Sequence, residues 1–111
     1  MSWFEKRRQQ KAASATRSLL QKIDGREIQY ATRREPDEHG NPSETVLGKG
    51  GRIWLHEDEV RISSATAELF ACSMAEVEAG ELMSGDGLVL KGLNIRTGQV
   101  ETVVAYYLYF R

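Results

Sequence analysis

The apolar residues at the start of the chain are spaced as they are in a helix. Residues 2–23 contain no Gly or Pro and many Ala, Gln, Lys and Arg residues, which favour helix. The small and apolar residues of the second half share one arc at about 100° per residue; they are Ala12, Ala15, Thr16, Leu19, Leu20 and Ile23. Trp3 and Phe4 lie off this arc. Because Gly25 follows the last apolar position, we predict that the helix ends there.

After Gly25 the pattern changes to the two-residue alternation of β-strands. Residues 67–72 fit either a strand or a helix, and we interpret them as a strand. At residues 73–76 a Ser and a Glu have the spacing of a capping box, which allows one helical turn there. Residues 35–44 contain both prolines of the chain and are predicted to form a polar, acidic loop. The predicted strands are residues 28–33, 45–47, 53–55, 60–62, 67–72, 77–83, 88–95 and 100–110.

Turn signals recur roughly every 8–12 residues between these short strands, which is typical of a barrel or a sandwich. We therefore predict a mainly β, α+β fold: an antiparallel barrel or strongly bent sheet of about 6–8 strands with one N-terminal α-helix. The chain divides into a basic helix at residues 1–24 and a β-rich domain at residues 25–111. A composition that is 41% hydrophobic and 28% charged excludes a disordered or fibrous chain.

The order of motifs between Gly51 and Tyr106 resembles a known family. A glycine, a basic residue and an apolar-x-apolar strand (Gly51–Leu55) lead through an acidic turn to a second apolar-x-apolar strand (Val60–Ile62). A short strand and the brief apolar stretch Met74–Val77 come next, and Gly87–Leu90 then faces Val100–Val104 across Thr97-Gly98. This order of motifs is similar to that of bacterial pleckstrin-homology-like (PH-like) and GRAM domains.

The resemblance implies a PH-like barrel that acts as a binding or assembly module. Two features of the chain differ from the family. PH-like barrels end in a helix, whereas this chain ends in a predicted strand. Lipid-binding members collect Lys and Arg in the loop between the first two strands, whereas here residues 35–40 are acidic and would repel a phosphoinositide headgroup.

Charge is distributed unevenly along the chain. Residues 1–22 carry six Lys or Arg against one Glu, which gives +5, so the remainder carries −6 of the total of −1. The candidate contact residues are Trp3, Phe4, Lys6, Arg7, Arg8 and Lys11. They would suit a protein partner, an anionic membrane surface or, less well, the phosphates of a nucleic acid. The alternative is a solvated helix whose Leu19, Leu20 and Ile23 dock on the β-rich domain.

No set of residues predicts catalysis or metal binding. Cys72 is the only cysteine, and an acidic neighbourhood would raise its pKa, so pairing with His39 or His56 as nucleophile and base is disfavoured. His56 and the acids at 57–59 are consecutive turn residues that would point in different directions. The glycine-rich turns at 48–51 and 84–87 precede strands, not the helix that a phosphate loop needs. We predict a non-enzyme with no cofactor, metal or evident small-molecule substrate.

The C-terminal residues 106–110 carry large side chains on both faces of a predicted strand, so one face needs cover. Tyr107 and Tyr109 are therefore candidates for self-association. The expected function is a small protein-interaction or self-assembly module. The alternatives are a peripheral membrane module that uses the basic helix and a small-ligand carrier. With a lone cysteine, no secretory signal and no long apolar segment, we expect a cytoplasmic protein.

Overall fold

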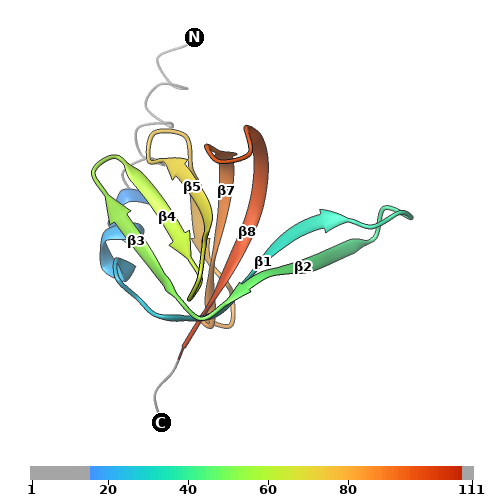
Figure 1. The fold of residues 1–111 in the computed structure, drawn as a ribbon, viewed down its shortest axis with the longest axis horizontal. Helices are drawn as coiled ribbons and strands as arrows, with labels where there is room; N and C mark the ends of the chain where they lie inside the picture. The colour runs from blue at the N-terminus through green and yellow to red at the C-terminus, as the bar shows by residue number, and fades with distance from the viewer. Residues whose placement is uncertain (1–15, 109–111) are drawn as a thin grey trace.

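The computed structural model describes residues 16–108 of the 111-residue chain (Figure 1). A helix at residues 16–23 precedes eight strands. The strands are β1 (Ile28–Pro36), β2 (Pro42–Lys49), β3 (Arg52–His56), β4 (Glu59–Ser63), β5 (Glu68–Ser73), β6 (Glu78–Glu81), β7 (Gly87–Asn94) and β8 (Gln99–Tyr107). The predicted fold class, mainly β with a helix before the strands, is confirmed.

The strands form two antiparallel sheets and not a closed barrel. The larger sheet has the order β2-β1-β8-β7-β6, and the smaller has the order β3-β4-β5. Two seams join them. At the first seam, Ile53 of β3 bonds through its backbone to Gly25 and Arg26, just before β1. At the second seam, the Ile95 amide after β7 donates to the Ala71 carbonyl of β5 over 2.8 Å. The result is two antiparallel sheets joined along two seams, which fits the predicted mainly β, α+β class.

A buried amide and a buried carboxylate hold the second seam. Asn94 is 1% exposed, and its Oδ1 accepts hydrogen bonds from the backbone amides of Ala71 and Arg96. Its Nδ2 donates to Glu101 over 3.3 Å, and the other oxygen of Glu101 accepts from the Thr97 hydroxyl over 2.6 Å. The β7–β8 turn therefore satisfies its own polar groups while it covers β5.

One hydrophobic core draws on both sheets and on the helix. Leu20 and Ile23 belong to the same buried cluster as Ile53, Phe70 and Leu90. Of the alternatives for the helix, the structure therefore supports the one in which its second half docks on the β-rich domain. Residues 2–15 of that prediction lie outside the described part of the chain. Since the two helical side chains are fully or almost fully buried, the helix end is part of the fold and not an appendage.

The step from the larger sheet to the smaller depends on Gly51. This residue has φ 103°, a left-handed conformation that side chains other than glycine rarely adopt. A Cβ placed on it would overlap the carbonyl oxygen of Ser63, at the end of β4. The absence of a side chain lets the chain leave β2 and begin β3 beside β4.

Two local predictions can be compared directly with the structure. Residues 67–72, interpreted as a strand, form β5 almost as predicted. Residues 73–76 form a turn, in which Glu76 and Val77 donate to the Ser73 carbonyl, and no helix assignment extends over them.

The predicted polar loop at residues 35–44 is wrong. β1 continues to Pro36 and β2 begins at Pro42, so only residues 37–41 form the connection. The two prolines are paired with each other across the hairpin. Proline is tolerated at strand ends and on edge strands, where its missing N–H breaks no ladder bond. Because this hairpin is exposed on both faces, it also lacks the apolar alternation that reveals a half-buried strand.

Candidate functional site

The most exposed regular structure in the described chain is the outer half of the β1–β2 hairpin. We call residues 34–46 the arm; every one of them is exposed. Figure 1 shows that the β1–β2 hairpin extends to the right, beyond the other strands of the fold. An ordered hairpin that contributes nothing to the core is available for contact with another molecule.

A polar cluster fixes the arm to the larger sheet. Glu44 of β2 lies opposite Arg34 of β1, and its Oε1 accepts hydrogen bonds from the Tyr106 hydroxyl, the Thr32 hydroxyl and Arg34 Nε. These distances are 2.9, 3.1 and 3.4 Å. The Tyr106 ring stacks on Tyr30 with their centroids 4.6 Å apart. The cluster therefore connects β2 to β8 across β1 and sets the direction in which the arm leaves the body.

The ionisation of this cluster favours a charged Glu44. Partial burial acts to raise the pKa of Glu44, but the bonds from Tyr106, Thr32 and Arg34 outweigh it and lower the pKa from its usual value. Burial and the bond to Glu44 raise the pKa of Tyr106. At neutral pH the cluster thus contains a carboxylate and a protonated phenol, which is the combination that its hydrogen bond needs.

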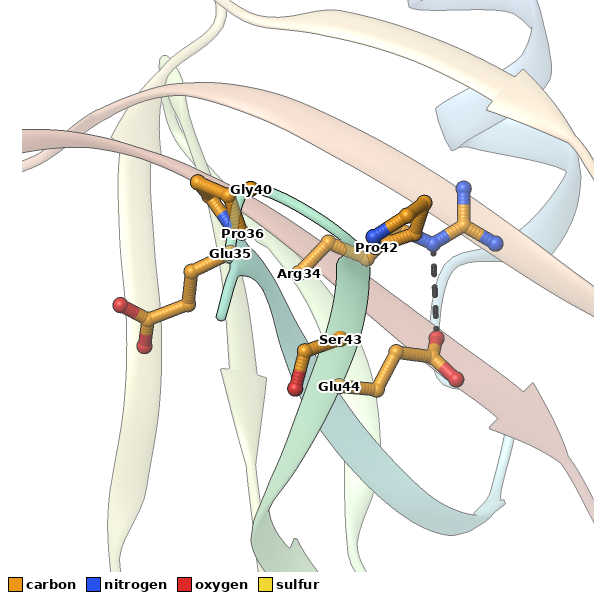
Figure 2. A pocket seen from close by; sticks show the side chains of 7 residues that line it. All are labelled: Arg34, Glu35, Pro36, Gly40, Pro42, Ser43 and Glu44. Atoms are coloured by element: carbon orange, nitrogen blue, oxygen red, sulfur yellow. Dashed lines mark hydrogen bonds and ion pairs between the residues drawn. The ribbon is translucent and has the colours of Figure 1, made fainter. Parts of the chain in front are cut away.

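Two hollows lie at the arm. The first, about 580 Å³, is formed by the arm itself and is lined by Arg34, Glu35, Pro36, Gly40, Pro42, Ser43 and Glu44 (Figure 2). In Figure 2, Arg34 and Glu44 point to one side of the hairpin, and Glu35 and Ser43 point to the other. The second hollow, about 330 Å³, lies between the arm and the start of β8, and it shares Arg34, Glu35 and Pro36 with the first.

The lining of the two hollows is balanced in charge. Three cations and three carboxylates contribute: Arg33, Arg34, Lys91, Glu35, Glu44 and Glu101. Arg33 pairs with Glu35 at 2.5 Å and Arg34 with Glu44 at 3.4 Å, while Pro36, Pro42 and Val100 add apolar surface. A phosphate or an anionic lipid would need an excess of cations. This mixture of paired charges and prolines suits a polypeptide better.

The outer edge of β2 has no neighbouring strand in the described chain. The other edges are covered or short. Segment 24–27 covers β3, where the Leu55 amide donates to Asp24 Oδ1 over 2.7 Å. The β7–β8 turn covers β5, and β6 has four residues with a glutamate at each end, a common protection against pairing. β2 therefore presents the longest unpaired edge among residues 16–108.

The predicted contact residues lie largely outside the part of the chain that the structure describes. This applies to Trp3, Phe4, Lys6, Arg7, Arg8 and Lys11 and also to Tyr109. Tyr107 is 2% exposed and belongs to the core, with the Arg26 guanidinium 4.2 Å above its ring. Self-association through Tyr107 would need this side chain at the surface. The arm was not predicted from the sequence, in which its one signal is the placement of two prolines on either side of a short turn.

The residues considered for chemistry are separated by the fold. Cys72 lies in the core, where burial and the nearby Glu76 raise its pKa, whereas His39 lies at the exposed tip of the arm. Between residues 16 and 108 no three His, Cys, Asp or Glu side chains are grouped as metal ligands. In the same range no helix is long and apolar enough to cross a membrane.

Comparisons with known proteins add no relative. No protein-family model, no curated protein and no solved structure matches the chain. The similarity to PH-like domains therefore stays a prediction from the sequence pattern.

Proposed function

We propose that this chain is a small, non-enzymatic protein-interaction module of PH-like type, and that the arm is its contact surface. The observation that carries the proposal is the free edge of β2, exposed from Pro42 to Val46, on a hairpin that the Glu44 cluster holds in place. An exposed sheet edge recognises an extended polypeptide by adding it as a further strand. Main-chain hydrogen bonds would supply affinity in such a complex.

The first hollow, which β2 helps to line, would supply specificity. In strand addition, alternate side chains of the bound segment point to the same face of the sheet. A segment beside β2 would direct some of its side chains toward Arg34, Pro42 and Glu44. The paired charges and prolines of this surface favour a segment that carries both polar and apolar residues.

A random-peptide display library selected on the full-length protein tests this proposal. We expect enrichment of β-prone peptides and at least a tenfold loss of affinity, about 1.4 kcal/mol, when Val46→Asp adds a charge beside the edge. Lys22→Ala, at an exposed helical position, is the matched control and should bind as wild type does. Peptides that bind Val46→Asp and wild type equally would show that the arm is not the contact surface.

The basic N-terminal segment supports a second candidate, a peripheral membrane module in the cytoplasm. Its +5 charge and its two aromatic residues are suited to an anionic membrane surface. Wild type should co-sediment with liposomes that contain anionic lipid. The combined change of Trp3, Lys6, Arg7 and Arg8 to Ala should abolish this, and unchanged sedimentation of that variant would contradict the candidate.

A further inference from the structure

We propose that the polypeptide paired with the β2 edge is a second copy of this chain, with Thr45 of each copy on the two-fold axis. The proposal rests on the function above, since it names the partner of the same edge. In a two-fold dimer the same surface of both copies meets, so one segment has to be complementary to itself. The segment after Pro42 in β2 has this property.

The two ends of the pairing segment are set by backbone chemistry. Pro42 has no N–H and cannot donate to a neighbouring strand. At the other end, the Lys49 carbonyl accepts from the Ala65 amide over 3.3 Å, and Gly48 lies against Ser64 and Leu69. Residues 43–47 are therefore the part of the β2 edge that is open to another strand.

The charges of the segment and the length of its open edge favour an antiparallel register centred on Thr45. This register sets Ser43 opposite Leu47 and Glu44 opposite Val46, so it uses the whole open segment. A register centred on Glu44 would place two carboxylates directly opposite, which is destabilising. A register centred on Val46 would place Glu44 opposite Gly48, which Ser64 already covers.

The side chains on the outer face fit the same register. Val46 is 54% exposed, which is high for a valine in a strand. In the dimer it would lie against the aliphatic part of Glu44 of the second copy. Glu44 is the one charged residue of the segment, and its carboxylate is already engaged by Tyr106, Thr32 and Arg34. No unpaired charge therefore protects this edge from a second β2 strand.

The remaining charges of the two arms are complementary. In an antiparallel pair, the tip of each arm lies beside the base of the other. The tip carries Asp37 and Glu38, and the Asp37 carboxylate accepts from the Asn41 amide over 2.9 Å, at the level of the turn. The base carries the exposed Lys49. Each acidic tip would thus meet a lysine of the other copy.

The expected dimer is weak. Pairing over five residues buries much less than the roughly 1,200 Å² of total surface found in stable complexes. The association should therefore appear at high protein concentration, and it should respond to single charges in the segment.

Thiol cross-linking of the full-length protein tests the geometry. In Thr45→Cys the two new side chains would lie directly opposite, with Cβ atoms about 4.5–5.5 Å apart, so mild oxidation should link two copies. Glu38→Cys is the matched control, because the two tips lie at opposite ends of the dimer. Wild type is the second control, since its Cys72 is buried. Equal cross-linking of the two variants would overturn the Thr45 register.

Light scattering over a concentration series tests whether the partner is a second copy of the chain. Val46→Glu would face Glu44 of the second copy and should abolish dimers, whereas Val46→Lys would face the same carboxylate and should retain them. Thermal melting should show that both variants remain folded. A strict monomer at high concentration would overturn the self-pairing, and so would an equal loss of the dimer in both variants. Peptides that still bind the arm would leave the proposed function intact, whereas a monomer that also selects no peptide would contradict both.

Discussion

The β1–β2 hairpin and the β3–β4 hairpin differ in what surrounds them. In β3 and β4, Ile53, Val60 and Ile62 are fully buried, and segment 24–27 covers the outer edge. In the outer half of β1 and β2, every residue is exposed and the edge is open. Burial makes the first hairpin part of the stability of the domain. The second hairpin is held by a polar cluster. Substitutions in it should change the stability of the domain little, so its surface is free to adapt to a partner.

The largest expected effect is in the body of the fold. Phe70 is fully buried in the core, and Phe70→Ala would remove its contacts and leave a cavity. We expect a loss of about 3–5 kcal/mol in the free energy of unfolding. Chemical denaturation monitored by circular dichroism measures this. A loss as small as that of an exposed residue would show that the core is not organised as described.

Gly51→Ala tests the corner that separates the two hairpins. The new methyl group would overlap the Ser63 carbonyl, and alanine would be strained at φ 103°. We expect the free energy of unfolding to fall by at least about 2 kcal/mol. Gly40→Ala, also at positive φ but with open space around it, provides the control for backbone strain alone. Equal losses in the two variants would mean that Ser63 does not crowd Gly51.

Glu44 connects the arm to the body and gives a pH-dependent effect. Its pKa is lowered in the folded protein, so its contribution is present above the usual carboxylate pKa and is lost as the pH falls through the folded value. Because the side chain is more than a third exposed, we expect Glu44→Gln to cost less than about 1 kcal/mol at pH 7. Wild type and variant should converge in acid. A difference that is the same at pH 7 and at low pH would contradict the role of the charge.

Val46→Ala should have the smallest effect. Val46 is exposed in the monomer, so the free energy of unfolding measured in dilute solution should change by no more than about 0.5 kcal/mol. The same change should weaken self-association, which analytical ultracentrifugation at high concentration measures. If Val46→Ala destabilised the monomer as much as a core substitution, the arm would have to be packed against something.

The sequence predicted the parts of the fold in which buried residues recur with the spacing of a helix or a strand. Leu20 and Ile23 share a helical face, and Ile53 alternates with exposed Arg52 and Trp54, so the helix end and β3 were both correctly placed. The arm has no buried face, and its prolines are typical of loops, so pattern analysis could not identify it. The Glu44 cluster was equally hidden, because Tyr106 is 62 positions away along the chain and only strand pairing brings the two together.

Amide hydrogen exchange over a range of protein concentrations tests directly whether the open β2 edge pairs with another copy. We expect amides within residues 43–47 to exchange more slowly as the protein concentration rises, while the amides of β3 and β4 keep their rates. The pairing would be contradicted if exchange in residues 43–47 did not depend on protein concentration, up to the highest concentration at which the protein stays in solution.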